Sequence, residues 1–213
     1  MNTTCKREFV TIALPKGRLA EEAVDFFSRI GLIERDLLDF ESRKLIFEDN
    51  KNALRFLLVK NTDVATYVER GGADLGVAGL DMLLESAAEV YEFSDLAFGA
   101  CRMSIAAPNG KHTFYKQNIK AATKYPNITK NTFASKGIYV EIIKLFGSIE
   151  IAPLTDLADY IVDLVDTGET LRKNGLSEVE VIFNSTARLI GNKALTAIKH
   201  SQVKQILSAV GEC

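Results

Sequence analysis

Short apolar runs alternate with stretches of helical periodicity along most of the chain. Phe9–Leu14 ("FVTIAL") has the composition of a buried strand, and Leu19–Gly31 places its apolar side chains on one helical face before a terminal glycine. The same order follows with a strand at Ala53–Lys60, a short helix "VATYVERG" and a strand "ADLGVAG". This alternation predicts an α/β fold with parallel sheets built from crossover units, and it argues against a sandwich or barrel of hairpins.

The second half of the chain repeats this order without repeating the sequence. Strands are expected at Cys101–Pro108, in "IKAATKY", in "IYVEIIKL" and at Tyr160–Val165, with helices in "PNITKNTFASKG" and "PLTDLAD" and a loop in "GKHTFYKQN". A terminal helix carries apolar residues at helical spacing, namely Val203, Ile206, Leu207 and Val210. We therefore expect two α/β lobes, residues 1–97 with 172–213 and residues 98–171, joined by extended crossover strands and separated by a cleft.

Composition and charge narrow the classes of partner and site. The net charge of -2 makes no electrostatic case for nucleic acid or for an anionic membrane surface. Cys5, Cys101 and Cys213 are scattered and form no CxxC motif, which argues against a disulfide framework and against a structural zinc site. The N-terminal segment has no apolar signal core, and no apolar run approaches the roughly 20 residues of a membrane helix. We expect a cytoplasmic protein.

The stretch Ile161–Gly175, "IVDLVDTGETLRKNG", has two incompatible interpretations. Two apolar residues followed by Asp-Thr-Gly resemble the catalytic loop of an aspartic protease, with Asp166 as half of a carboxylate dyad. Such a protease needs two of these loops on an all-β frame, because two carboxylates must share one proton. The chain has one copy in a helix-rich pattern, and it continues with Glu169 where protease loops carry a small residue.

The second interpretation is a loop that binds a sugar phosphate. Asp163 and Asp166 end a buried strand, where carboxylates can accept hydrogen bonds from vicinal ribose hydroxyls. The next residues present backbone N–H groups and two hydroxyls at the start of a helical segment, which is an anion site: Thr167, Gly168, Glu169 and Thr170. A strand-to-helix turn with Thr170 as a cap is the alternative without a ligand.

Two basic segments favour the phosphate interpretation. Lys16 and Arg18 flank Gly17 in the first βα loop, at the carboxyl end of a strand, where open α/β folds bind ligands. Arg43 and Lys44 precede another strand, and the planar fork of an arginine suits pyrophosphate. Taken singly, the first segment could be a solvated turn and the second ordinary surface charge.

Three further residues are weaker candidates. Gly79 would let the backbone approach a ligand in the cleft, while Asp81 can cap the following helix. Glu150 could face a ribose or Mg²⁺, or it could form a salt bridge.

Several segments resemble the ATP phosphoribosyltransferase family, the first enzyme of histidine biosynthesis. They occur in the family's order over nearly the whole chain: "PKGRL", "ESRKLIF", "DVATYVERGGADLGVAGLDMLLE", "ATKYPNIT", "IIKLFGSIEIAPL" and "DLADYIVDLVDTGETLRKNGL". The family's signature for phosphoribosyl pyrophosphate (PRPP), an acidic strand end followed by Thr-Gly-x-Thr-Leu, is present as Asp163, Asp166, Thr167, Gly168, Thr170 and Leu171. The resemblance implies two lobes of the periplasmic-binding-protein type II architecture with an active-site cleft between them.

The resemblance also implies a reaction. N1 of the ATP adenine attacks C1 of PRPP, and Mg-pyrophosphate leaves with inversion. Cations near the leaving group should lower the barrier, and by matching motif these are Arg18 and Arg43, assisted by Lys16. Mg²⁺ is expected to bridge pyrophosphate oxygens rather than to sit in a protein cage, and no organic cofactor is expected.

The family has a long form with a C-terminal regulatory domain and a short form without it. The chain ends at Cys213, soon after the terminal helix, so it resembles the short form. That form is catalytic in a hetero-octamer with a regulatory subunit resembling a histidyl-tRNA synthetase, through which histidine inhibits; alone, we expect a homodimer. A rival from another class stays open, because the same architecture serves solute-binding modules that do not catalyse.

Overall fold

The computed structural model describes residues 8–110, 118–194 and 197–211. Cys5, Cys213 and most of the predicted loop "GKHTFYKQN" lie outside the described residues. Among the residues that it does describe, every helix is too short or too polar to cross a lipid bilayer.

The described chain divides into two compact units. The first comprises the described residues of Met1–Gly99 and Thr186–Cys213, and the second comprises those of Ala100–Ser185. The chain therefore leaves the first unit after Gly99 and returns after Ser185. The expected second boundary near Leu171 differs from this division, because strand β10 (Leu176–Ser185) pairs along its length with β6 (Cys101–Pro108) of the second unit.

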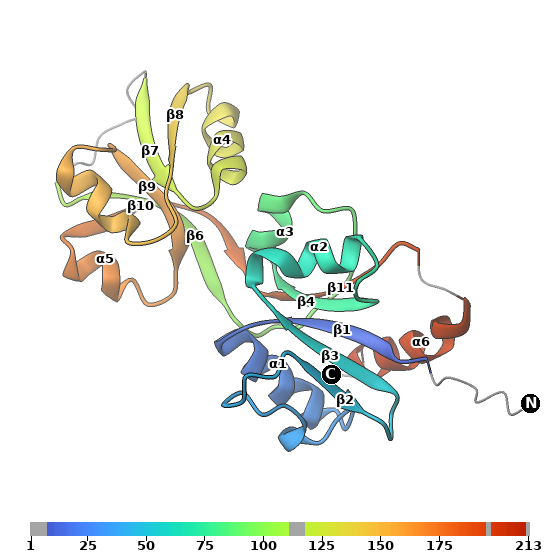
Figure 1. Cartoon of the computed structure of the whole chain (residues 1–213). Helices are drawn as coiled ribbons and strands as arrows, with labels where there is room; N and C mark the ends of the chain where they lie inside the picture. Colours follow the sequence, from blue (N-terminus) through green and yellow to red (C-terminus); the bar gives the residue numbers. More distant parts are fainter. Residues whose placement is uncertain (1–7, 111–117, 195–196, 212–213) are drawn as a thin grey trace, which may run out of the picture. The chain divides into compact units, whose positions relative to one another are not determined.

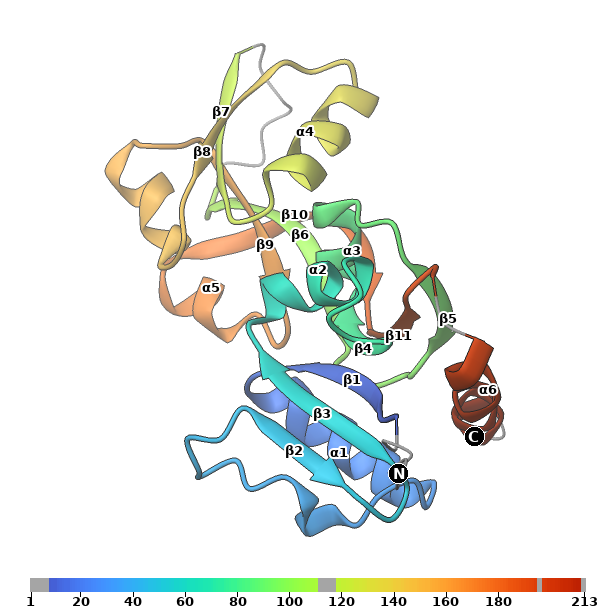
Figure 2. The same ribbon diagram turned by 45° about the vertical axis from the view of Figure 1, so that its right-hand side comes forward.

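The first unit is an α/β layer structure around a mixed sheet with strand order β2-β3-β1-β4-β11-β5 (Figures 1 and 2). Its elements are β1 (Val10–Pro15), α1 (Arg18–Arg29), the 3₁₀ turn η1 (Arg35–Leu37), β2 (Ile46–Asp49), β3 (Leu54–Val59), η2 (Asn61–Asp63), α2 (Val64–Glu69), β4 (Leu75–Gly79), α3 (Leu80–Ser86), β5 (Tyr91–Asp95), β11 (Ala187–Gly191) and α6 (Ala197–Gly211). The expected β/α alternation is confirmed, and β5 was missed.

Parallel pairing holds only in the centre of this sheet. β1 lies parallel to both β3 and β4, as expected for crossover units. β2 and β3 are antiparallel because the short link between Asp49 and Leu54 permits only a hairpin. β11 runs antiparallel to β4 and β5 on its return from the second unit. The expected parallel crossover units are therefore present in the centre of the sheet, and the strands outside it pair antiparallel.

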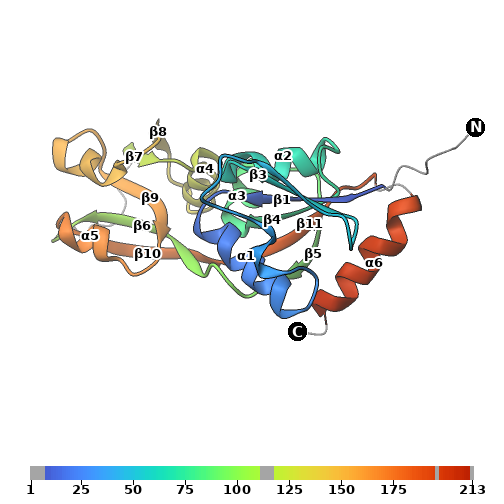
Figure 3. The ribbon, with the colours of Figure 1, turned by 60° about the horizontal axis from the view of Figure 1, so that its bottom comes forward.

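The alternation of side chains along β1 decides which helix covers each face. Val10, Ile12 and Leu14 pack with buried residues of α1 and α6, whereas Ala13 packs with residues of α2. Figure 3 shows α1 and α6 on one side of the sheet and α2 and α3 on the other. Because both faces are covered, β1 is buried along its whole length and reads as a continuous apolar run.

The second unit is built on a mixed sheet with strand order β10-β6-β9-β7-β8. Its elements are β6, β7 (Ile119–Thr123), α4 (Pro126–Ser135), β8 (Val140–Lys144), the 3₁₀ segment η3 (Ile149–Thr155), β9 (Tyr160–Val165), α5 (Glu169–Lys173) and β10. The expected strands are confirmed. "PLTDLAD" is not an α-helix: its first three residues end the 3₁₀ segment, with Pro153 inside it, and the other four form turns and bends before β9.

Two helices cover opposite faces of this second sheet. α4 packs on β7 and β8, and α5 lies on the other side, where Leu171 joins a core with Ile161 and Val165 of β9 (Figure 1). β9 is central, parallel to β7 and antiparallel to β6. The end of β9 is therefore held on both sides, and the loop that follows it starts from a fixed position.

Candidate active site

The acidic strand end is built by β9 and its neighbour β6. Ile161, Asp163 and Val165 alternate along β9 on the face toward α5. Ser104 of β6 is paired directly with Asp163 in the antiparallel register, so its side chain lies on the same face. The carboxylate of Asp163 and the hydroxyl of Ser104 are therefore neighbours on the sheet, close to the loop that follows β9.

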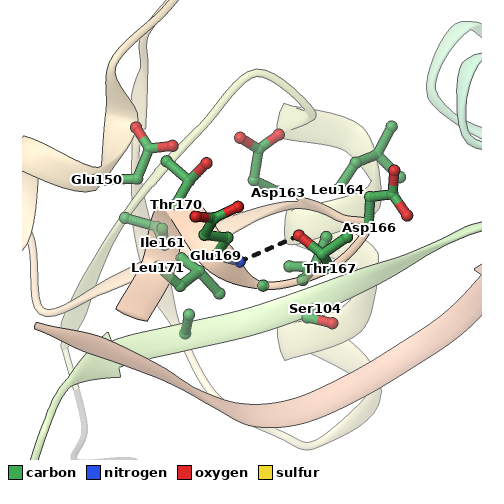
Figure 4. A pocket seen from close by; sticks show the side chains of 13 residues that line it. Ser104, Glu150, Ile161, Asp163, Leu164, Asp166, Thr167, Glu169, Thr170 and Leu171 are labelled. Atoms are coloured by element: carbon green, nitrogen blue, oxygen red, sulfur yellow. Dashed lines mark hydrogen bonds between the residues drawn. The ribbon is translucent and has the colours of Figure 1, made fainter. Parts of the chain in front are cut away.

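The loop and the strand end line one pocket of the second unit, shown in Figure 4. All six residues predicted to bind PRPP lie in this lining: Asp163, Asp166, Thr167, Gly168, Glu169 and Thr170. Glu150, which follows Ile149 at the start of η3, lines it as well. The structure therefore brings together the two acidic strand residues, both loop hydroxyls and one carboxylate that is distant in the sequence.

The turn between β9 and α5 depends on glycine. Gly168 has φ of 73° and ψ of 10°, a left-handed conformation that side chains disfavour, and it is the N-cap residue of α5. The N–H of Glu169 donates to Oγ1 of Thr167 at 3.3 Å, the bond drawn in Figure 4. Thr170 lies inside the helix and in the pocket lining, so the alternative in which Thr170 caps the helix is wrong.

Lys124, the residue that follows β7, is a further cation near this pocket. Its Nζ lies 3.8 Å from Oδ2 of Asp163, whose side chain is only 17% exposed. Lys124 belongs to the segment "ATKYPNIT" of the family resemblance, which assigns it no role. Ser104 could not be predicted as a site residue, because the sequence around it is that of an ordinary apolar strand.

A pair of charged residues lies beneath the turn. Arg102 of β6 donates from Nε and Nη2 to the two carboxylate oxygens of Glu178 on β10, at 2.7 and 2.5 Å. Its Nη1 donates to the backbone carbonyl of Asp166 at 2.8 Å. The bidentate hydrogen bonds from Arg102 lower the pKa of Glu178, against the opposing effect of partial burial, and Glu178 in turn raises the pKa of Arg102.

The predicted cations gather in the first unit. Lys16 follows β1, and Gly17, with φ of 93°, leads into α1. A pocket in this unit is lined by Lys16, Gly17, Arg43 and Lys44 among other residues. Arg18 is absent from that lining; its Nε lies 3.4 Å from Oε1 of Glu22 one helical turn later, and its side chain is 63% exposed. The structure thus joins two of the three predicted cations, Lys16 and Arg43, in the lining of one pocket, and Arg18 is not part of that lining.

Gly79 and Asp81 have a structural explanation. Gly79 is the N-cap residue of α3, and a side chain there would collide with the carboxylate of Asp81. Asp81 is 3% exposed and lies within the first turn of the helix. The N-cap residue is Gly79, so the expectation that Asp81 caps the helix is wrong. Neither residue lines the pocket of the PRPP loop or that of the cations.

Comparison with known proteins identifies the family. The family model for HisG, ATP phosphoribosyltransferase, matches residues 60–212. The chain belongs to the ATP phosphoribosyltransferase family. It is 53% identical over 205 residues to the ATP phosphoribosyltransferase of Caldanaerobacter subterraneus subsp. tengcongensis, covering 96% of this chain and 97% of that protein. Its identity to the enzyme of Geobacter metallireducens is 51% over 207 residues, covering 95% and 97%.

Solved structures agree with this membership. The ATP phosphoribosyl transferase (HisG:HisZ) complex from Thermotoga maritima contains a chain with a TM-score of 0.82 and 31% identity, and the match covers 96% of this chain and 98% of that one. A substrate binding protein of an amino acid ABC transporter matches with a TM-score of 0.56 at 11% identity, covering 96% and 92%, a likeness of fold alone. The predicted two-lobe α/β fold of the periplasmic-binding-protein type is confirmed, and the protease interpretation is excluded.

Proposed function

We propose that this chain is an ATP phosphoribosyltransferase that transfers the phosphoribosyl group of PRPP to N1 of ATP, the first step of histidine biosynthesis. One observation carries the proposal: a chain of this family holds the whole Asp163–Thr170 loop in the lining of one pocket. ATP and PRPP are cytoplasmic metabolites, so we assign the reaction to the cytoplasm.

The loop residues divide into two roles in this proposal. Asp163 and Asp166 accept hydrogen bonds from the 2- and 3-hydroxyls of the ribose, a contact that ionised carboxylates make well. The 5-phosphate accepts hydrogen bonds from the backbone N–H groups of the turn and from the hydroxyls of Thr167 and Thr170. Glu150 lies in the same lining and is available to a ribose hydroxyl or to substrate-bound Mg²⁺.

The cations act on the leaving group. The lone pair of adenine N1 forms the new bond to C1, and the C1–O bond breaks with its electron pair leaving on pyrophosphate, so the configuration at C1 inverts. Negative charge grows on the pyrophosphate while C1 becomes oxocarbenium-like. We assign Arg18 and Arg43, with Lys16, to this charge, because preorganised cations stabilise it without reorganising in the transition state. Mg²⁺ enters bound to the pyrophosphate oxygens as part of the substrate.

A regulatory partner belongs to this proposal. One solved relative, with a TM-score of 0.82 to this chain, is described as a HisG:HisZ complex. We propose that this chain likewise works in a hetero-octamer with a regulatory subunit resembling a histidyl-tRNA synthetase, through which histidine inhibits.

Ultraviolet absorbance with ATP, PRPP and Mg²⁺ tests the proposal directly. We expect phosphoribosyl-ATP to form, with a higher rate when the regulatory subunit is present. Product that forms only when ATP and PRPP are both present would identify phosphoribosyl transfer rather than ATP hydrolysis. Tight binding of PRPP without any product, with or without the regulatory subunit, would instead support a solute-binding module.

A further inference from the structure

An ion pair between Arg102 and Glu178 lies next to the turn that follows β9. Neither residue is among the site residues predicted from the sequence. Arg102 and Glu178 are 76 residues apart in the chain and meet through two parallel hydrogen bonds. A Cβ atom built on Gly168 would lie 3.8 Å from Nη2 of Arg102 and 3.8 Å from Oε1 of Glu178. A side chain added at Gly168 would therefore be in ordinary van der Waals contact with both members of the pair, so the pair lies directly beside the turn.

A β-bulge brings Glu178 to this face of the sheet. Glu178 is paired with Ala106 of β6, whereas Glu180, two residues later, is paired with Ile105. This register shift inserts one extra residue into β10, so the two glutamates face opposite sides of the sheet although strict alternation would put them on one side. Glu178 turns toward Arg102 and the turn, and Glu180 turns toward α4, where it meets Lys136 at 2.6 Å.

The third hydrogen bond of Arg102 orients the peptide that opens the turn. Its Nη1 holds the carbonyl oxygen of Asp166. Every described peptide is trans, so the N–H of Thr167, in the same peptide plane, points away from Arg102. Arg102 itself does not line the pocket of the loop, whereas Thr167 does. The carbonyl of Asp166, which would repel a phosphate, thus faces Arg102, and the N–H of Thr167, which would bind one, faces the opposite way.

The charge of Arg102 is already matched within the protein. Glu178 accepts hydrogen bonds from Nε and Nη2 of Arg102 and also one from Oγ of Ser104 at 2.7 Å. Since Ser104 lines the pocket, the network continues from the turn to the wall of the site. A guanidinium satisfied in this way acts through geometry rather than as a direct ligand of phosphate.

We infer that Arg102 and Glu178 are positioning residues that hold the Asp166–Gly168 turn in its PRPP-binding conformation. The inference rests on the proposed function and adds to it a second layer of residues that the substrate does not touch. It predicts a selective effect: affinity for PRPP depends on the pair, and affinity for ATP does not.

Calorimetric titration of the full chain with PRPP and Mg²⁺ tests the inference. Arg102→Met and Glu178→Gln should each raise the Kd for PRPP by about tenfold to a hundredfold, the usual consequence of a binding group displaced by about an ångström. In the assembled enzyme, the KM for PRPP should rise by the same factor while the KM for ATP stays at the wild-type value.

The chain offers a matched control in the ion pair on the opposite face. Lys136 and Glu180 have side chains that are 30% and 34% exposed, close to the 32% and 24% of Arg102 and Glu178. Glu180→Gln removes a pair of similar exposure from the same strand and should leave the Kd for PRPP unchanged. A rise equal to that of Glu178→Gln would show a general effect of β10 and would overturn the inference.

The remaining outcomes are also decisive. Pair variants that melt cooperatively and bind PRPP like the wild type would overturn the inference and leave the proposed function intact. If Arg102→Met does not fold, Arg102→Lys carries the test, because an ammonium keeps the charge but cannot make the same fork of hydrogen bonds to Glu178 and Asp166. A wild-type chain that binds no PRPP would refute the proposed function, and this inference with it.

Discussion

Gly168 shows how closely the loop's sequence follows its backbone. The turn needs a left-handed residue with φ of 73° directly before α5, and the Thr-Gly-x-Thr pattern supplies glycine at that position. The flanking threonines then fall in the pocket lining together with Asp163 and Asp166. These residues were predictable from the sequence because strand, turn and helix start lie within a dozen consecutive positions.

The cations of the first unit lead to a kinetic prediction. Arg18→Ala and Arg43→Ala should each slow the chemical step by roughly 10²-fold or more, because each removes preorganised positive charge from the departing pyrophosphate. Single-turnover rates at saturating ATP and PRPP measure that step. Arg35→Ala is the control, since Arg35 forms an exposed ion pair with Asp25 in the same unit. Unchanged rates in both test variants would show that the assigned roles are wrong.

Thr170→Ala should behave differently from the arginine variants. Its hydroxyl lies in the pocket of the loop, where we assign it to the 5-phosphate, a group that carries the same charge before and after transfer. Loss of such uniform binding raises KM and leaves kcat unchanged. Steady-state kinetics with varied PRPP distinguish the two cases, and a fall in kcat at unchanged KM would contradict the assignment.

At the scale of the element, the central strand β4 is tightly packed against α2. A Cβ atom on Gly76 would lie 2.7 Å from Cγ2 of Val68 and 3.0 Å from Cγ1 of Val64. Gly76→Ala should therefore lower the free energy of unfolding by about 1–3 kcal/mol, the usual cost of overpacking. Gly147→Ala, where no atom lies within 4 Å of the added Cβ, should change it by less than about 0.5 kcal/mol. Urea denaturation of both variants measures the difference.

The β6–β10 ion pair predicts how stability responds to acid. The pKa of Glu178 is lowered from its ordinary value of 4.5 in the folded chain, chiefly by the hydrogen bonds from Arg102. A carboxylate with a depressed folded pKa stabilises the fold above its unfolded pKa, and that stabilisation is lost as the pH falls through the folded pKa. Thermal melting between about pH 6 and pH 3 should show a smaller loss for Glu178→Gln than for the wild type. Equal losses would contradict the prediction.

The elements themselves were largely predictable, and their pairing was not. The apolar runs and helical periodicities marked the β/α order correctly, with β5 missed. The bulge in β10 lies outside the reach of such patterns, because Glu178, Val179 and Glu180 alternate as in any regular strand. Only the register against β6 shows that the two glutamates face opposite sides.

At the scale of the whole molecule, the chain forms two units, and each contains some of the residues that we assign to PRPP. The PRPP loop lies in the second unit, and the cation pocket in the first. The first unit is assembled from both ends of the chain, since β11 and α6 return to the sheet that begins with β1. The expected first lobe is likewise discontinuous, with the return of the chain near Leu171; in the structure the chain returns after Ser185, where only Thr186 separates β10 from β11.

Assembly with the regulatory subunit is the prediction at this scale. Mixing the two proteins should yield a complex with the mass of a hetero-octamer by size-exclusion chromatography with light scattering, and histidine should inhibit that complex. Histidine should leave the chain alone unaffected, because the proposed histidine site belongs to the partner. Full inhibition of the chain alone by histidine would contradict the proposal that the histidine site belongs to the regulatory subunit.

The sequence by itself determined the local features: the order of strands and helices, the glycine turn, and the acidic and hydroxyl groups that line its pocket. These features depend on interactions between residues a few positions apart, so they can be predicted from the local sequence. The tertiary structure alone decided the antiparallel return of β10, the bulge that separates Glu178 from Glu180, and the contact of Arg102 with Asp166 and Glu178. Such contacts join residues more than sixty positions apart, and only the register of the folded sheet specifies them.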